Sequence, residues 1–338
     1  MSQLMQQEKI GLTLESLGQM YTSFTLSRVL TVSLQLGVFS HIAAGKKTAK
    51  EIAQVAEASE RGMCMLLDAL VVFQVLNKTD GSYELTPLAA EFLVSGQPNY
   101  LGGFLGSDWQ WEGWSHLTEV IRTGKPYIRP EEEAKLFYPN LVPYLHLVNR
   151  EPARRCAHIL TAGTSHQNMQ VLDVACGSGI WGIAIAEAHQ QSHITAQDSS
   201  NVLDVTREYL KRHGVQDRYD FLPGDLNVVE FGENCFDLAV VGHIVHIVGE
   251  HSSRNLFKRL YSALKPGGQI AVVDFLPNNE RTGPVFPIIF GLSMFVDNEN
   301  GSTYTRSEYT QWLTEAGFER IDTAEIGGHN SLVTGVRK

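Results

Sequence analysis

The chain has 338 residues, more than one typical domain, so two domains are expected. Its 43% hydrophobic and 19% charged residues are typical of a globular protein with a large core. The formal net charge of −10 argues against a nucleic-acid or anionic-membrane partner, because phosphate binding needs a basic surface.

The cysteines are scattered along the sequence and include no CxxC pair. This spacing indicates neither a zinc site nor a disulfide framework, and it favours a reducing cytoplasm. The N-terminal segment Met1–Lys9 has neither secretory nor transit-peptide character, and no apolar run reaches the roughly 18 residues that span a membrane. The cysteines are Cys64, Cys156, Cys176 and Cys235.

Residues 1–97 are predicted to form a mainly helical domain that ends in a hairpin. Apolar residues follow helical spacing over Leu26–Leu36, and Thr48 and Ser59 are the expected N-cap residues of two further helices. Two strand-like runs then flank Thr79-Asp80-Gly81, a turn typical of hairpins. The predicted elements are helices at 26–36, 49–56 and 60–73, and strands at 75–78 and 82–86.

Three helices followed by a hairpin is the order of a winged helix. Winged helices bind DNA in some proteins and mediate oligomerisation or act as lids in others. The predicted recognition helix, residues 60–73, has Arg61 as its only basic residue, beside Glu60 and Asp68. The electrostatic attraction that dominates DNA affinity is therefore missing, which favours an oligomerisation or lid module over DNA binding.

Residues 98–166 are predicted to be a helical connecting segment rich in aromatic side chains. An aromatic cluster between two domains is either part of the core or the wall of an apolar substrate pocket, and the sequence leaves both open. Our candidates for an acceptor pocket are Trp109, Trp111, Tyr138 and Tyr144 of this segment, with Phe290 and Met294 from later in the chain.

Residues 167–338 alternate between strand-like and helix-like segments, which predicts a doubly wound, mostly parallel sheet. Pro266-Gly267-Gly268 is expected to break the chain cleanly before a strand, and the last strand is expected to be antiparallel, within a C-terminal hairpin. The predicted strands are 171–175, 194–197, 219–222, 238–241, 269–275 and 332–336, and the predicted helices are 179–188, 202–213, 252–263 and 306–316.

The run Val171–Gly182 combines a buried strand, a glycine turn and the start of a helix. Its spacing Gly177-x-Gly179-x-x-Gly182 matches the dinucleotide pattern, and Asp198 ends the next apolar run, where an acid binds a ribose. Asp173 lies inside the first strand, where a carboxylate repels a pyrophosphate but suits a cationic amino group. S-adenosylmethionine carries such a group, a ribose and no phosphate, so we expect a methyl-donor site.

Further motifs follow one another along most of the chain. They are Leu117–Pro126, the turn Lys265-Pro266-Gly267-Gly268, and Tyr304–Tyr309 before Ala316-Gly317-Phe318. In this order they resemble the class I S-adenosylmethionine-dependent methyltransferases, and more closely the O-methyltransferases of plant phenolics and bacterial natural products. The resemblance implies a Rossmann-like α/β catalytic domain (167–338), with a mostly parallel sheet and an antiparallel C-terminal strand, preceded by a winged-helix-like dimerisation domain.

The resemblance also implies which residues hold the donor. In the family pattern Asp/Glu-x-Gly-x-Gly-x-Gly, Ala175 takes the place of the first glycine. Asp198 matches the ribose-binding acid, and Gly224-Asp225-Leu226 matches the segment that meets the adenine. Without the resemblance, Asp198 could equally be a helix cap and Gly224-Asp225 could equally be an ordinary turn. The expected donor-binding residues are Asp173, Ala175, Gly177, Ser178, Gly179, Asp198, Gly224, Asp225, Leu226, Gly242 and His243.

In the resembled family a histidine at the position of His246 is the general base. Such a base suits phenols, whose pKa of about 10 leaves little phenolate at neutral pH, while histidine titrates near about 6.5. Asp274 matches the acid that orients this histidine. Two other family acids are absent, one replaced by Ile247 and one missing near Thr303. N- or C-methylation therefore stays open, as does the alternative that His246 is a core histidine.

A metal is not expected. His243 and His246 are spaced i, i+3 at a strand-to-helix junction, near Glu250 and His251, which matches no zinc motif. The ligands of metal-dependent catechol methyltransferases are not evident either.

We therefore expect a dimeric, cytoplasmic enzyme that uses S-adenosylmethionine to methylate a hydroxyl of a small aromatic or polyketide-like metabolite. A nicotinamide-dependent oxidoreductase would share the glycines and Asp198 but leaves Asp173 and Asp225 unexplained. A DNA-binding regulator that senses a metabolite is a third hypothesis, which the acidic charge disfavours.

Overall fold

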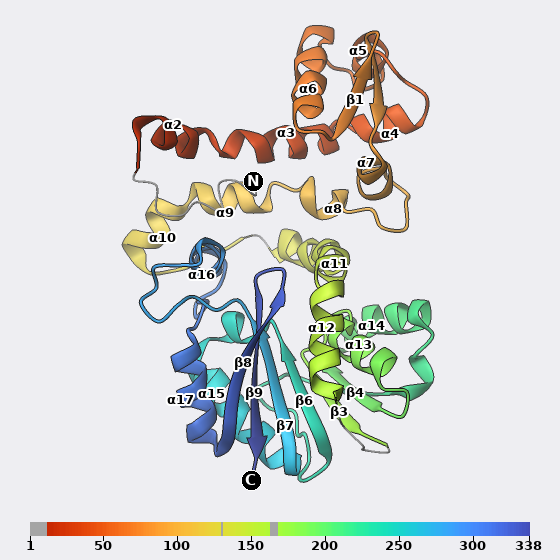
Figure 1. The fold of residues 1–338 in the computed structure, drawn as a ribbon. Helices are drawn as coiled ribbons and strands as arrows, with labels where there is room; N and C mark the ends of the chain where they lie inside the picture. Colours follow the sequence, from red (N-terminus) through yellow and green to blue (C-terminus); the bar gives the residue numbers. More distant parts are fainter. Residues whose placement is uncertain (1–11, 130, 163–167) are drawn as a thin grey trace. The chain divides into compact units, whose positions relative to one another are not determined.

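The computed structural model describes residues 12–129, 131–162 and 168–338, which form two compact units (Figure 1). One unit comprises Met1–Glu112 with Arg129–Tyr144, and the other comprises Gly113–Ile128 with Leu145–Lys338. The segment 98–166, which we predicted as one connecting piece, is divided between them. The predicted boundary at 166/167 and the segment Met1–Lys9 lie outside the described residues.

The first unit contains the predicted helices and hairpin. Thr48 and Glu51 form a capping box at the start of α5, and the Ser59 side chain caps α6. Asp80 and Gly81 take positive φ angles of 50° and 79° in the turn between the antiparallel strands β1 and β2. The elements are α2 (Leu14–Thr22), α3 (Phe24–Gln35), α4 (Val38–Ala43), α5 (Ala49–Val55), α6 (Glu60–Val72), β1 (Leu76–Thr79), β2 (Ser82–Leu85), α7 (Pro87–Phe92) and α8 (Gly102–Leu105).

The second unit is built on a sheet with strand order β5-β4-β3-β6-β7-β9-β8. β3 to β7 pair in parallel, whereas β9 is antiparallel to both β7 and β8, which confirms the doubly wound sheet and the antiparallel C-terminal hairpin. The strands are β3 (Gln170–Val174), β4 (His193–Asp198), β5 (Tyr219–Pro223), β6 (Phe236–Gly242), β7 (Leu264–Asp274), β8 (Phe318–Gly327) and β9 (Asn330–Arg337).

Pro266-Gly267-Gly268 lies inside β7 and not before it, although the continuous pairing of β7 with β6 begins only after these residues, at Gln269. β7 begins at Leu264 and runs through these residues, because Gly267 takes a φ of 81° and the pairing with β6 shifts register between Phe236 and Leu238. The turn residues are accommodated as an irregularity within the strand instead of ending it.

Helices cover both faces of this sheet: α12, α13 and α14 lie on one face and α15 and α17 on the other (Figure 1). α9 (Trp109–Ser115) and α11 (Glu131–Val148) each contribute residues to both units. The remaining elements of the second unit are α10 (Leu117–Thr123), α12 (Arg150–Thr161), α13 (Ile180–Ala188), α14 (Ser200–His213), the 3-10 turn η1 (Gln216–Arg218), α15 (Val245–Ala263), α16 (Val285–Asp297) and α17 (Arg306–Ala316).

α15 begins seven residues before the predicted start at 252, at Val245. Gly249, with a φ of 82° and a ψ of 174°, interrupts it after the first turn. That short first turn carries His246, so a helical segment that the periodicity did not indicate positions the predicted base.

Parallel strands bring their carboxyl ends to one edge of the sheet, where ligands of such folds bind. Asp198 ends β4, Gly242 ends β6, Asp274 ends β7, and Asp173 is the penultimate residue of β3. The predicted donor-binding and catalytic residues of the second unit therefore meet at this edge. Among the described helices, none combines the length and apolarity needed to cross a membrane.

Candidate active site

The glycine-rich loop after β3 has a tightly constrained backbone. Ala175, Gly177 and Gly179 have positive φ angles of 50°, 56° and 77°. Ala175 adopts a conformation that favours glycine, at a cost of about 1–2 kcal/mol. The Ala175 N–H donates to Gln197 Oε1 at 3.2 Å, and the Gly177 N–H donates to Asp198 Oδ2 at 3.0 Å. The loop is thus held against the end of β4.

Asp198 and the segment after β5 lie beside this loop. The second oxygen of Asp198, Oδ1, accepts the Ser199 N–H at 2.8 Å. Burial raises the pKa of Asp198, while the hydrogen bonds from Gly177 and Ser199 oppose this rise. Asp225 is exposed, and its Oδ1 accepts the Asn227 N–H at 2.8 Å, as in an Asx turn. Leu226 is half-buried against the core of the second unit.

These features fit a nucleoside ligand with hydroxyl groups. Asp198 keeps part of its surface exposed at the end of β4, where its carboxylate can accept hydrogen bonds from a ribose. A Cβ atom built on Gly177 would meet nothing within 4 Å, so the loop leaves open space beside this carboxylate. The loop, Asp198 and Leu226 therefore suit the donor expected from the sequence.

Asp173, the acid expected from the sequence to meet the amino group of the donor, lies inside the second unit. Its side chain is fully buried; Oδ2 accepts the Gly182 N–H at 3.0 Å and Oδ1 has no partner. Burial raises the pKa of Asp173 to about 8, so the carboxyl group is largely protonated at neutral pH. A buried, neutral group has no exposed oxygen to offer to an ammonium ion. Asp173 instead holds the first turn of α13, where Gly182 leaves room for it.

His246 and Asp274 form a buried pair. His246 Nδ1 lies 2.6 Å from Asp274 Oδ1, which also accepts the Phe275 N–H at 2.8 Å. Asp274 Oδ2 accepts the Tyr309 hydroxyl at 2.7 Å. Burial alone would raise the pKa of Asp274, but the charge and hydrogen bond of His246, with the contributions of His243 and Tyr309, outweigh it and lower that pKa.

The ionised Asp274 determines the tautomer of His246. A carboxylate only accepts hydrogen bonds, so Nδ1 of His246 carries the hydrogen and Nε2 of the neutral ring is the basic nitrogen. The Phe290 ring lies edge-on to the His246 ring, with 4.9 Å between centroids. The sequence analysis did not assign a role to Tyr309, although it lies in the Tyr304–Tyr309 motif; nothing in the sequence shows that its hydroxyl reaches β7.

His243 lies between this pair and Trp181. Its ring centroid is 5.7 Å from those of both Trp181 and His246, and its ring nitrogens are buried without a well-formed hydrogen bond. Burial lowers the pKa of His243 to about 4, against the opposing effect of Asp274, so the ring is neutral. Gly242 is required beside it, because a Cβ there would meet Trp181 Nε1 at 2.3 Å.

The structure brings His243, His246 and Asp274 close enough to ligate a metal, within 4.8 Å of one another. The sequence spacing did not reveal this cluster because Asp274 comes from another strand. The 2.6 Å contact between His246 and Asp274 is a hydrogen bond, shorter than the roughly 3.3 Å between two ligands of a tetrahedral zinc ion. We therefore do not propose a metal here, and its absence stays a prediction.

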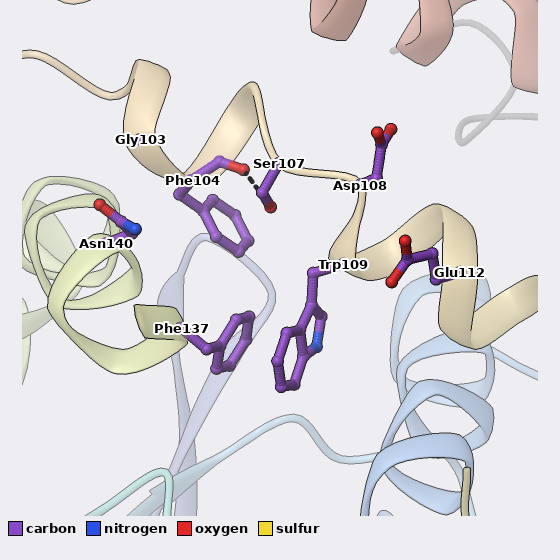
Figure 2. Close-up of a pocket in the computed structure, with 8 residues that line it drawn as sticks. All are labelled: Gly103, Phe104, Ser107, Asp108, Trp109, Glu112, Phe137 and Asn140. Carbon is purple, nitrogen blue, oxygen red and sulfur yellow. Dashed lines mark hydrogen bonds between the residues drawn. The ribbon is translucent and has the colours of Figure 1, made fainter. Parts of the chain in front are cut away.

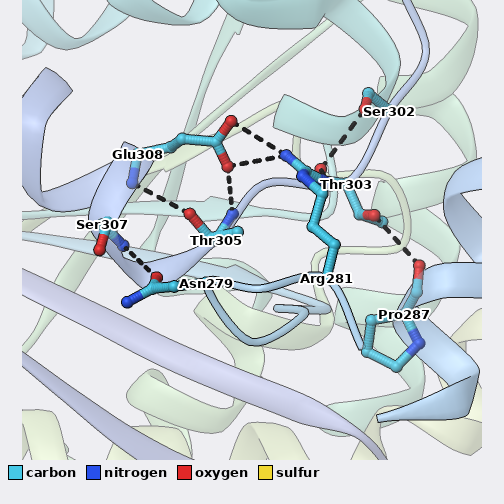
Figure 3. A network of polar contacts seen from close by, with 8 residues as sticks. All are labelled: Asn279, Arg281, Pro287, Ser302, Thr303, Thr305, Ser307 and Glu308. Carbon is cyan, nitrogen blue, oxygen red and sulfur yellow. Dashed lines mark hydrogen bonds and ion pairs between the residues drawn. The ribbon is translucent and has the colours of Figure 1, made fainter. Parts of the chain in front are cut away.

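A polar network surrounds Thr303, near which the second family acid is missing (Figure 3). Arg281 donates to both carboxylate oxygens of Glu308, at 3.0 and 2.9 Å, and to the Thr303 carbonyl oxygen at 2.9 Å. The Thr303 hydroxyl donates to the Pro287 carbonyl oxygen at 3.1 Å. Thr303 thus anchors the start of α16, the helix that carries Phe290.

The remaining acceptor-pocket candidates of the sequence analysis lie in both units. In the first unit the Trp109 indole stacks on the Phe137 ring at 3.9 Å beside a cavity of about 270 Å³ (Figure 2). Tyr144 packs on Phe104, which lines the same cavity, whereas Trp111 packs on Phe24 instead and is not among the lining residues. Tyr138 is 55% exposed. In the second unit, Met294 lies one helical turn after Phe290 on α16.

Comparison with known proteins identifies the family. The methyltransferase domain family matches residues 171–268, and the O-methyltransferase dimerisation domain family matches residues 19–95. The first match covers the glycine-rich loop and the strands β4 to β6, and the second covers the helices α3 to α7 with the hairpin β1–β2. The chain belongs to the class I S-adenosylmethionine-dependent O-methyltransferases.

Relatives of this methyltransferase match it along nearly the whole chain. It is 28% identical to the 3-hydroxy-5-methyl-1-naphthoate 3-O-methyltransferase of Streptomyces sahachiroi, over 94% of this chain and 93% of that protein. It is 27% identical to the tetracenomycin polyketide synthesis 8-O-methyl transferase TcmO of Streptomyces glaucescens, over 94% and 95%. The solved structure of a candidate O-methyltransferase from Nostoc punctiforme has a TM-score of 0.80 at 27% identity, covering 96% and 99% of the two chains.

The methyltransferase uses S-adenosylmethionine as its cofactor, and the family match excludes the alternative of a nicotinamide-dependent oxidoreductase. The match to a dimerisation domain likewise gives the winged-helix region a role other than DNA binding.

Proposed function

We propose that this methyltransferase transfers a methyl group to a hydroxyl of a small aromatic or polyketide-like metabolite, with His246 as general base. The observation that carries this proposal is the buried His246–Asp274 pair, which leaves Nε2 of His246 basic and holds the ring in place. The acceptors named for the Streptomyces relatives, a hydroxynaphthoate and a polyketide, are in keeping with it.

The bound donor would supply a methyl group on a sulfonium, which is already a good leaving group. The residues of the chain therefore have two tasks. His246 Nε2 takes the hydroxyl proton of the acceptor, while Asp274 stabilises the resulting imidazolium and Tyr309 stabilises the carboxylate. Aromatic walls orient the acceptor for an in-line displacement, and such positioning supplies much of the rate acceleration.

We propose that the donor is held by the glycine-rich loop, Asp198 and Gly224-Asp225-Leu226, with Gly242 and His243 at the end of β6. For the acceptor we propose Phe290 and Met294 of α16. Phe290 has the most direct structural support, because its ring touches that of His246.

Replacing Asp198 tests the donor site. In Asp198→Asn, the affinity for S-adenosylhomocysteine should fall about 30-fold, because the carboxylate that would accept from two ribose hydroxyls loses its charge. Isothermal titration calorimetry measures this change. Asp204→Asn is the matched control, since Asp204 is an exposed acid on α14 that pairs with Arg207. Equal affinity in wild type and Asp198→Asn would remove Asp198 from the donor site.

We further propose a homodimer formed through the first unit. Helix α2 has no buried residue, and Leu14, Met20 and Tyr21 are exposed by 60% or more. Such a surface suits a protein interface. Sedimentation of the full chain tests this, with a monomer at micromolar concentration as the contrary result. We also propose the cytoplasm as its location, because all four cysteines are free thiols.

The acceptor is tested with a panel of phenols, amines and enolic carbon acids and a methyl-labelled donor. Methylation of phenols supports the proposal. Two family acids are absent, one replaced by Ile247 and one missing near Thr303. Methylation of amines or carbon acids alone would therefore move the reaction to N- or C-transfer and end the role of His246 as a phenol base.

A further inference from the structure

A chain of polar side chains connects the glycine-rich loop with the surface of the second unit. Ser178 Oγ lies 3.0 Å from His146 Nδ1, and His146 Nε2 lies 3.2 Å from His213 Nε2. His213 Nδ1 in turn lies 2.8 Å from Glu187 Oε1. Ser178 and His146 are buried, whereas His213 and Glu187 keep 19% and 40% of their side chains exposed. A group deep in the site is thus connected with groups that reach solvent.

The carboxylate at the outer end determines the direction of every hydrogen bond in this chain. Glu187 only accepts, so His213 Nδ1 carries a hydrogen and Nε2 of neutral His213 is an acceptor. His146 must then donate from Nε2 and accept at Nδ1. Ser178 consequently donates its hydroxyl hydrogen to His146, away from any ligand of the loop.

Protonation of His213 reverses this order. Protonated His213 donates from both nitrogens, so His146 must accept at Nε2 and carry its hydrogen on Nδ1. The proton balance closes with one proton from solvent: His146 passes its Nε2 hydrogen to His213, Ser178 passes its hydroxyl hydrogen to His146 Nδ1, and Ser178 takes up the solvent proton. The Ser178 hydroxyl then accepts from His146 and is free to donate to a ligand.

The surroundings disfavour an added proton on His146. Burial, together with the charges of His213, Arg150 and Arg212, lowers the pKa of His146 to about 3. Besides His213, the charged neighbours of His146 are Arg150 of α12 and Arg212 of α14, and both arginines stay charged. Helix α13 contributes Glu187, the carboxylate that contacts His213. Tyr209, stacked on His146 at 4.1 Å, stays neutral because burial raises its pKa.

We propose that His146 and His213 are positioning residues that control, through Ser178, how tightly the glycine-rich loop holds the methyl donor at a given pH. The inference rests on the proposed donor site. S-adenosylmethionine and its demethylated product, S-adenosylhomocysteine, both carry a carboxylate group. This carboxylate gains a hydrogen bond when the Ser178 hydroxyl can donate to it. Affinity therefore rises as pH falls and the coupled pair of histidines takes up a proton.

Calorimetric titration of the full chain with S-adenosylhomocysteine, between about pH 5 and pH 8, tests this. Affinity should be about tenfold higher at the acidic end, the worth of one charge-assisted hydrogen bond. Binding near neutral pH should be accompanied by proton uptake. His213→Asn and His146→Asn should flatten the pH profile. His193→Asn is the matched control and should keep the wild-type pH profile. It removes a histidine–carboxylate pair, His193–Asp220 at 2.9 Å, that lies outside this chain of contacts.

A second measurement does not depend on any variant folding correctly. In wild-type protein labelled with ¹⁵N-histidine, long-range ¹H–¹⁵N spectra should show His146 with its hydrogen on Nε2 at high pH and on Nδ1 at low pH. A single tautomer throughout, or identical pH profiles in wild type, His146→Asn and His213→Asn, overturns the inference. Absence of S-adenosylhomocysteine binding at every pH contradicts the donor site itself, which is a distinguishable failure.

Discussion

Replacing His246 with alanine should lower kcat by about a thousandfold, within the range that general acid–base groups contribute. The reason is that Nε2 of His246, which carries no hydrogen while Nδ1 donates to Asp274 at 2.6 Å, is the proposed acceptor of the substrate proton. The affinity for S-adenosylhomocysteine should change by less than about threefold, because the proposed donor contacts lie on other residues. Steady-state kinetics with the best phenol of the panel, together with calorimetry, measures both quantities.

Three further variants make the result specific. His251→Ala changes an exposed histidine on the same helix and should leave kcat unchanged. Asp274→Asn should lower kcat because the amide favours the wrong tautomer of His246, and Tyr309→Phe should lower it less, because it removes only one donor to Asp274. Full activity of His246→Ala would show that the acceptor loses its proton without help or to another base.

The fold could be predicted because its signals are local. Thr48 and Ser59 cap helices through neighbours three residues away, and Asp80-Gly81 forms its turn from its own dihedral preferences. Alternation of strands and helices likewise indicated the parallel sheet. The start of β7 was harder to place: the strand begins at Leu264, before Pro266-Gly267-Gly268, although its continuous pairing with β6 begins only at Gln269.

The site could be predicted only in part, because side-chain direction and burial depend on distant elements. His246 and Asp274 were found through family motifs, but the Tyr309 hydroxyl that completes the pair comes from α17, 35 residues further along the chain than Asp274. The connection of His146 with Ser178 spans 32 residues and has no sequence signal at all. The direction of Asp173 is set by the packing of α13 on β3, so a motif match alone could not tell a ligand contact from a buried one.

The buried Asp173 should make the protein less stable as pH rises from about 4 to about 8. Its pKa is about 8 in the folded chain and about 3.9 in an unfolded one, so the folded state binds more protons across this window. A group of this kind stabilises the fold below its unfolded pKa, and this contribution is lost on approaching the folded pKa. The slope from one such group approaches about 1.4 kcal/mol per pH unit.

Asp173→Asn isolates this contribution. The amide is neutral at all pH values, and its oxygen can accept the Gly182 N–H. The variant should therefore have a higher thermal unfolding midpoint than wild type at pH 8, and the difference should shrink towards pH 4. Parallel midpoint curves would contradict the raised pKa. The same variant should bind S-adenosylhomocysteine with an affinity within about threefold of wild type, since a carboxyl group without an exposed oxygen cannot touch the donor. A large loss of affinity would instead support the direct contact between Asp173 and the amino group of the donor that the sequence suggested.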